Sequence, residues 1–193
     1  MNNNNNNNNT SKRSEYLLKI QNAQNDYYNN NQKKNLFRTA QKSECANYVS
    51  TSIQLEHLIE STAFIVPNTN IVYFNYAVFK TYGNPENAKH IYTHIIALLE
   101  TILATHDSYE LHVNLKSFSV SACQRYYSMI VSSIDSNNIF SEKLNKLILY
   151  HTPFIIDQIT GLLYNSIKPF LHKIEYVKEK SDERISQLFK NVV

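Results

Sequence analysis

The sequence predicts an α/β fold, with a mixed, mostly parallel sheet that is flanked by helices. Runs of β-branched and aromatic residues alternate along the chain with segments in which apolar residues recur every three or four positions. Residues 147–150 are apolar without interruption, which is typical of a strand that is buried on both faces. Parallel neighbours need a crossover helix between them, and the alternation of the two patterns supplies such helices.

The chain divides into an Asn-rich beginning and one folded domain at residues 43–193. Asn fills positions 2–9 and recurs at 29–31. Residues 1–42 hold few aliphatic side chains, so little apolar surface is available to offset the entropy lost on ordering. We therefore expect a low-complexity, disordered tail over residues 1–42, in which residues 15–24 could form one short amphipathic helix.

The first half of the domain predicts a leading helix, a strand and a long helix. Residues 43–63 carry apolar side chains at mostly helical intervals. Residues 71–80 are rich in β-branched and aromatic side chains, which favours a strand. An Asn-Pro-Glu triplet at 84–86 suits a helix start, and apolar residues then follow at helical steps as far as Ile102.

The second half of the domain repeats the strand and helix pattern. Every second residue is apolar over 109–115, the period of a strand. Ser121 and Gln124 have the spacing of a capping box, so we expect a second covering helix to begin there. The remaining predicted elements are the strand at 147–150, a long helix at 154–171, a short strand at 174–177 and a polar helix at 181–190.

Three segments in this order resemble the CRAL-TRIO lipid-binding family, in particular its divergent branch. They are YELHVNLKSFSV at 109–120, KLILYHTPFIID at 146–157 and NSIKPFLHKIEYV at 165–177, and the resemblance extends over the core at 71–177. It implies an α/β cup that binds a hydrophobic ligand, such as a phospholipid or an isoprenoid. The helix after Pro153 would then be a mobile gate over an apolar pocket. Its pocket-side residues would be Phe154, Ile155, Ile159, Leu162, Leu163, Ile167 and Phe170.

Polar side chains on the strand at 109–115 are further candidates for such a pocket. The strand period places Glu110, His112 and Asn114 together on one side. Two interpretations fit this arrangement. The three residues form a hydrogen-bonded polar floor of the pocket, or they face water.

The sequence predicts no catalytic residues, no metal site and no cofactor. Gly83 and Gly161 are the only glycines, which excludes a phosphate-cradling loop. His90 and His94 lie one helical turn apart, but no further ligands are placed to complete a metal shell. No nucleophile elbow or pair of carboxylates accompanies the other histidines. We therefore expect a protein that is not an enzyme.

The charge pattern and the apolar segments limit partners and location. The net charge of +3 is spread over interleaved signs, without the basic stripe of a nucleic-acid-binding protein. No signal peptide and no apolar run of about 18 residues is visible, so we expect a soluble, cytoplasmic protein. A lysine cluster suggests either transient contact with anionic membranes or a solvated surface. It consists of Lys168, Lys173, Lys178 and Lys180.

The same resemblance also implies an alternative function. Divergent members of the CRAL-TRIO family bind small GTPases or their regulators. The alternative to ligand binding is therefore a protein-interaction module on the same scaffold, in which the chain's own side chains fill the pocket.

Overall fold

The structure is a computed structural model of the whole chain, and it describes residues 4–32, 38–135 and 141–190. The chain forms two compact units. The first, which we call the helical unit, consists of residues 1–61 and 78–84. The second, the α/β unit, consists of residues 62–77 and 85–193. Each unit buries apolar side chains of its own.

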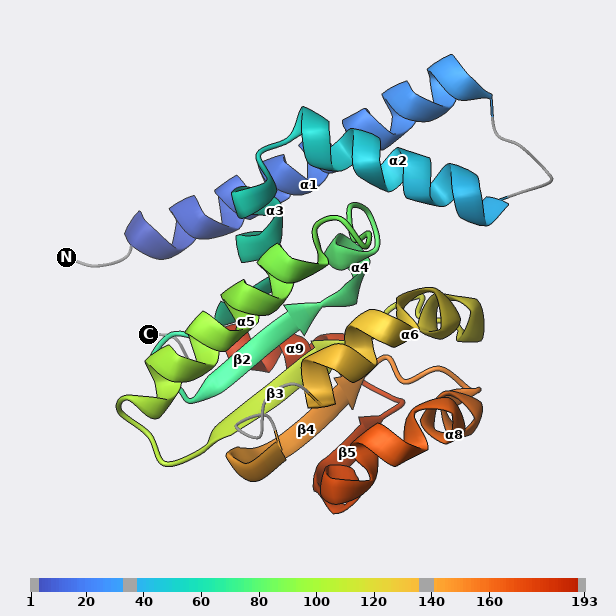
Figure 1. Cartoon of the computed structure of the whole chain (residues 1–193). Coiled ribbons are helices and arrows are strands. Elements are labelled where there is room, and N and C mark those ends of the chain that lie inside the picture. The colour runs from blue at the N-terminus through green and yellow to red at the C-terminus, as the bar shows by residue number, and fades with distance from the viewer. Residues whose placement is uncertain (1–3, 33–37, 136–140, 191–193) are drawn as a thin grey trace. The chain divides into compact units, whose positions relative to one another are not determined.

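The helical unit is built around a pair of adjacent helices, α1 (Asn4–Asn31) and α2 (Arg38–Ser52) (Figure 1). Ile20, Ala23 and Tyr27 recur at helical spacing on α1, and all three are buried. The Tyr27 hydroxyl donates a hydrogen bond to Glu44 on α2, with an oxygen–oxygen distance of 2.8 Å. These contacts tie α1 to α2.

The disorder expected for residues 1–42 is not confirmed, because α1 occupies Asn4–Asn31. Among the α1 side chains that the structure describes, residues 15–31, three are buried, and through them the helix contacts α2. The Asn-rich composition conceals this short apolar stripe. Residues 1–3 and 33–37 of the expected tail lie outside the described residues.

The leading helix predicted at 43–63 is in fact two helices. The first, α2, begins earlier than expected, and the second is α3 (Leu55–Thr62). Ile53 and Gln54 separate them. Three further residues of the α/β unit, Ala63–Ile65, form the strand β1, which the sequence did not predict. A strand of this length is too short to show a period.

The α/β unit contains a five-stranded sheet with the strand order β1-β2-β3-β4-β5. β1 pairs antiparallel with β2, and every other neighbouring pair is parallel. This confirms the predicted mixed, mostly parallel sheet. The other strands are β2 (Ile71–Asn75), β3 (Tyr109–Asn114), β4 (Leu144–Tyr150) and β5 (Ile174–Val177).

The strand predicted at 71–80 ends early, at Asn75. The side-chain Oδ1 of Asn75 accepts a hydrogen bond from the backbone N–H of Ala77, at 3.1 Å. Such a side-chain bond to the backbone two residues ahead turns the chain out of the strand. The short helix α4 (Tyr76–Phe79) follows.

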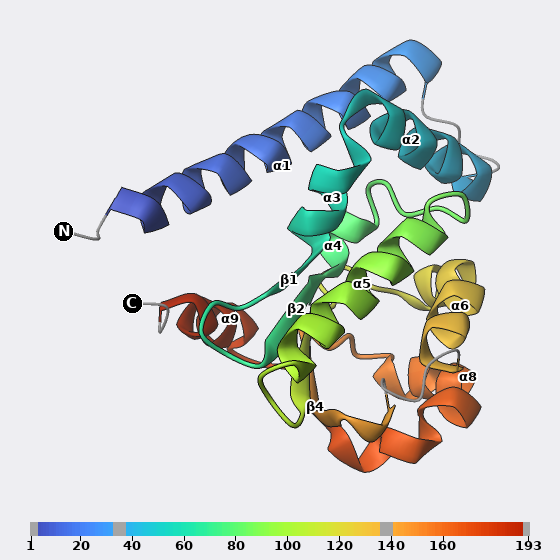
Figure 2. The same cartoon turned by 60° about the vertical axis from the view of Figure 1, so that its left-hand side comes forward.

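Three crossover helices cover one face of the sheet, and α9 (Ser181–Lys190) covers the other (Figure 2). The crossovers are α5 (Ala88–Leu103), α6 (Val120–Asp135) and α8 (Ile156–Ile167). The parallel strands follow one another in sequence order, so crossovers of one hand must all lie on the same side. Val113 and Leu149 point into the core beneath the crossovers. Ile148 and Tyr150, which flank Leu149 on β4, contact α9 on the other face.

The ends of the crossover helices differ from the predicted ones by a few residues. α5 begins at Ala88, after the Asn-Pro-Glu triplet. Ser119, not Ser121, caps α6, since its Oγ accepts from the Ala122 N–H at 3.2 Å. α8 ends at Ile167, and a 3-10 helix, η1 (Lys168–Lys173), replaces the rest of the predicted helix. Pro169 lies at the start of η1, where its fixed φ is tolerated.

None of the helices described by the structure combines the length and the apolar character that crossing a membrane requires.

Candidate functional site

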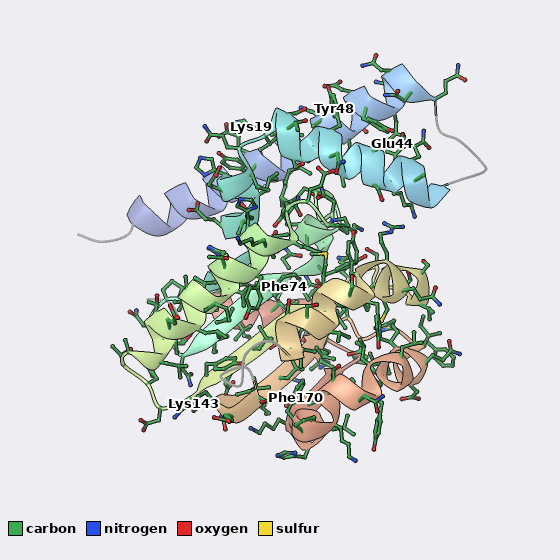
Figure 3. The ribbon with its side chains drawn as sticks, viewed as in Figure 1. Lys19, Glu44, Tyr48, Phe74, Lys143 and Phe170 are labelled. Carbon is green, nitrogen blue, oxygen red and sulfur yellow. The ribbon has the colours of Figure 1, made fainter. Side chains whose placement is uncertain are left out.

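Helix α8 presents its apolar stripe to the core of the α/β unit. Ile156 and Ile159 pack with Leu115 and Cys123 in one cluster. Ile167 joins a second cluster that contains Phe170, which is labelled in Figure 3. Ile159 is 3% exposed, Ile167 7% and Phe170 1%. These three residues of the expected pocket contact the protein's own side chains.

The other expected pocket residues lie on α8 or just before it. Leu163 is partly buried between the two clusters, and Ile155 is partly buried beside the first. Leu162 is 42% exposed, and Phe154 is 98% exposed. Phe154 points to solvent because α8 begins only at Ile156, so that Phe154 precedes the helical stripe. The seven predicted residues therefore do not share one face.

Five of the exposed residues on α8 and just before it form what we call the α8 surface: Phe154, Asp157, Gly161, Leu162 and Tyr164. Gln158 and Asn165 of α8 are exposed as well. A Cβ added at Gly161 would meet nothing within 4 Å, so the surface is open at this point. Asp157 is the only charged residue of α8. An exposed apolar surface with so little charge is suited to contact with another apolar surface.

Two of the three predicted polar residues form a partly buried hydrogen-bonded network with Tyr150. His112 Nδ1 lies 2.9 Å from the Tyr150 hydroxyl, and its Nε2 lies 3.2 Å from Glu110 Oε2. Asn145 donates to the other oxygen of Glu110, at 3.2 Å. His112 is 3% exposed. Asn114 lies apart from this network, because its Oδ1 accepts from the Lys116 N–H at the end of β3.

Burial determines the protonation state of this network. It lowers the pKa of His112, and the hydrogen bond with Glu110 opposes this effect only in part. Burial also raises the pKa of Tyr150 to about 12. The imidazole and the phenol are therefore both neutral at neutral pH.

The polar network and α8 lie on opposite faces of the sheet. Tyr150 contacts α9, whereas Leu149 contacts the core beneath the crossover helices. His112 is paired in register with Ile148, which also contacts α9. Glu110 and His112 are consequently beneath α9, and the side chains of α8 do not reach them.

Two further histidines, His94 and His151, have partners of their own. His94 Nε2 lies 2.9 Å from the carbonyl oxygen of Ala63 on β1. His151 Nε2 lies 3.0 Å from Asp182 Oδ1, so its partner differs from those of His112. Among the residues that the structure describes, no group of three or more His, Cys, Asp or Glu side chains is arranged to hold a metal ion.

The four lysines of the predicted cluster do not share one environment. Lys173 Nζ donates to the backbone oxygens of Ser141 and Leu144, at 3.1 and 2.6 Å, and so holds η1 to the start of β4. Lys168, Lys178 and Lys180 are exposed.

A groove of about 350 Å³ lies in the helical unit. It contains none of the residues predicted for a ligand pocket. Its walls come from α1 and from the end of α2, and Figure 3 labels two of the lining residues, Lys19 and Tyr48. The others are Tyr16, Asn22, Ala23, Asp26, Ser52, Ile53 and Gln54.

Comparisons of the chain with protein-family models, with curated proteins and with solved structures found no match.

Proposed function

We propose that the α/β unit is a non-enzymatic, cytoplasmic protein-interaction module that binds a protein partner through the α8 surface. The observation that carries this proposal is Phe154, whose side chain is 98% exposed at the start of α8. A large aromatic side chain that is fully open to solvent is the kind of residue that anchors a protein interface when a partner offers a pocket for it. Leu162 and Tyr164 extend the apolar area along the helix.

The packing beneath α8 supports this function over ligand binding. Ile159, Ile167 and Phe170 are the residues that a hydrophobic ligand would have to touch in a gated pocket. All three are engaged with the core. A ligand would have to displace these contacts, and each buried side chain of this size stabilises the fold by roughly 1.5 to 3 kcal/mol.

The charge of the α8 surface favours a protein over an anionic membrane. Membrane-surface helices combine apolar residues with Lys and Arg, each of which contributes about 1 kcal/mol near anionic lipids. Helix α8 carries only Asp157, an acid. For the partner itself, the resemblance to divergent CRAL-TRIO proteins implies a small GTPase or a GTPase regulator.

Site-specific photocrosslinking tests the surface. A photoreactive phenylalanine analogue at position 154 is expected to capture a discrete protein from a eukaryotic extract. The same analogue at Leu18, an exposed apolar position of the helical unit, is the matched control. The captured protein, once identified and purified, is expected to bind Phe154→Ala about 30-fold more weakly than the unaltered chain, as befits an interface anchor.

Two results would overturn the proposal. Equal affinity of the partner for Phe154→Ala and for the unaltered chain would remove the α8 surface from the interface. A stoichiometric lipid, seen by native mass spectrometry after purification from a eukaryotic host, would instead support hydrophobic-ligand binding.

A further inference from the structure

The groove of the helical unit is lined entirely by residues of that unit. Its volume of about 350 Å³ lies within the range of small-molecule sites. Four of the lining residues recur every three or four positions on α1 and so form one stripe of the helix: Tyr16, Lys19, Ala23 and Asp26. One wall of the groove therefore combines an aromatic ring, an ammonium group and a carboxylate.

Tyr48 brings a second aromatic ring to the groove from α2. Its side chain is 38% exposed, and its ring packs against that of Tyr27, with 5.8 Å between the centroids. The Tyr27 hydroxyl is in turn bonded to Glu44, one helical turn before Tyr48 on α2. These contacts hold the Tyr48 ring in place, so a group that stacks on it orders little that is not already ordered.

Asp26 supplies a negative charge at the same end of the groove, because it directly precedes Tyr27 in the chain. Its carboxylate makes no ion pair or hydrogen bond with any other residue in the described part of the chain. A carboxylate attracts cations, and so does the face of an aromatic ring. The groove presents both at one place, which is suited to a cation.

The positive charge of Lys19 is separated from this end of the groove. Lys19 and Asp26 are roughly 10 Å apart along the axis of α1, which is about one Debye length at moderate salt. Lys19 Nζ also pairs with Glu15 at 2.8 Å and lies 5.2 Å from the centroid of the Tyr16 ring. Figure 3 labels Lys19 and Tyr48, one on each helix. At the Tyr16 end, the chain's own ammonium group therefore lies against the aromatic ring.

A guanidinium group fits the Tyr48 end better than an ammonium group does. It is planar, so it can stack on the Tyr48 ring, and its fork of N–H donors can bond to both oxygens of Asp26. Ser52 and Gln54 also line the groove, and their side-chain oxygens can accept from its remaining N–H groups. An ammonium group is a compact, strongly hydrated charge that lacks the planar fork.

We propose that the groove of the helical unit binds a guanidinium group, from free arginine or from an arginine side chain of a peptide, with Asp26 as its counter-ion and Tyr48 as its stacking surface. This site is independent of the function proposed for the α8 surface. Since Asp26 and Tyr48 are both exposed, we expect a dissociation constant on the order of 1 mM for a single group.

Titration of the isotope-labelled full chain, followed by NMR at constant ionic strength, tests the site. The probes are free arginine, N-acetylarginine amide as a model of a peptide side chain, and N-acetyllysine amide as a cation without the planar fork. Both arginine probes should give saturable shifts of the amide resonances of residues 22–26 and 48–54. The lysine probe should bind about threefold more weakly or worse. Tighter binding of N-acetylarginine amide than of free arginine would identify a peptide as the ligand, and the reverse order would identify the amino acid.

Two variants assign the roles of the groove residues. Asp26→Asn keeps the size of the side chain but removes its charge, and should weaken binding of N-acetylarginine amide about fivefold. Tyr48→Leu keeps an apolar contact without the ring, and should remove most of the preference for arginine over lysine. Asp107→Asn is the matched control, because it makes the same change at an exposed position of the α/β unit. It should leave the affinity unchanged to within about twofold.

Four results would overturn the proposal. They are shifts that do not saturate, shifts confined to residues outside the groove, equal affinity for the arginine and lysine probes, and equal affinity of Asp26→Asn and the unaltered chain for N-acetylarginine amide. The first three are measured on the unaltered chain, so the test holds even where a variant fails to fold.

Discussion

Arg184 of α9 donates to Glu175 Oε1 at 2.8 Å, while Lys146 of β4 lies 2.6 Å from Oε2 of the same carboxylate. A single acid of the edge strand β5 therefore joins a neighbouring strand and the helix above it. The hydrogen bonds from Lys146 and Arg184 lower the pKa of Glu175 below 4.5.

This pKa shift predicts an acid-dependent loss of stability. Because the folded pKa of Glu175 is the lower one, its contribution is fully present above pH 4.5 and is lost as the pH falls through the folded value. Glu175→Gln should lower the free energy of unfolding at neutral pH by roughly 0.5 to 1 kcal/mol, as for a partly exposed pair. Urea unfolding between pH 7 and pH 3 measures both effects.

The variant should also show a shallower decline below pH 4.5 than the unaltered chain. Glu179→Gln, at an exposed position, is the control and should leave the pH profile unchanged. If both variants gave the same profile, the network around Glu175 would have no part in acid stability.

Alanine substitution of two phenylalanines near α8 should change the free energy of unfolding by very different amounts. Phe170 is 1% exposed and lies in the main core, so Phe170→Ala should destabilise the α/β unit by about 3 to 5 kcal/mol. Phe154 is 98% exposed, so Phe154→Ala should change stability by about 0.5 kcal/mol or less. Denaturant unfolding of both variants checks this. A large loss for Phe154→Ala would mean that its side chain is covered in solution.

The two glycines provide a matched pair of alanine substitutions. At Gly161 a Cβ has open space, and alanine favours the helix, so Gly161→Ala should stabilise the fold by about 0.5 to 1 kcal/mol. At Gly83 a Cβ would lie 2.7 Å from the Phe79 ring and 2.9 Å from the Phe79 carbonyl oxygen. The backbone atom cannot move aside easily, so Gly83→Ala should cost roughly 1 to 3 kcal/mol. Thermal unfolding of both variants gives the sign, and a stabilising Gly83→Ala would contradict the close approach.

Two neighbouring side chains of α1 test whether the Asn-rich segment packs on α2. Ile20 is 3% exposed and Leu18 is 57% exposed. Ile20→Ala should destabilise the helical unit by roughly 2 to 5 kcal/mol, with loss of amide protection over residues 15–31, while Leu18→Ala should have little effect. If the amides of residues 15–31 in the unaltered protein exchanged at the rate of an unstructured chain, the result would contradict this packing and support the disordered tail expected from the sequence.

The sheet could be predicted from the sequence because its strands carry strong local patterns. The alternation over 109–115 places β3 to within one residue. β4 begins three residues before the apolar run, at Leu144, because its first part includes Asn145 and Lys146. Both of these side chains bind carboxylates on the face of α9, Glu110 and Glu175. Because these partners lie on other strands, the residues next to Asn145 and Lys146 in the sequence show no pattern that predicts a strand there.

The helix α1 shows how composition can conceal a packed element. Its buried residues Ile20, Ala23 and Tyr27 have helical spacing, but they are surrounded by Asn and charged residues. The partner of Tyr27 is Glu44, 17 residues further along the chain. A helix that is stabilised by tertiary contact cannot be recognised from its own hydropathy alone.

The candidate site was predicted only in part, for geometric reasons. The strand period correctly placed Glu110 and His112 on one side, but the register with β4 determines that Tyr150 completes their network. The start of α8 two residues after Phe154 turns this side chain to solvent. A shift of two residues at the start of a helix is small, yet it decides which side chains face the core.

Because α9 follows all five strands in the chain, a ribosome that makes this protein releases the complete sheet before the helix that shields its second face. For that interval the nascent chain displays Ile148 and Val177 without their cover. Chaperones that recognise apolar surfaces could therefore engage the newly made sheet from this side alone, since α5, α6 and α8 precede the last strand and can already shield the opposite side.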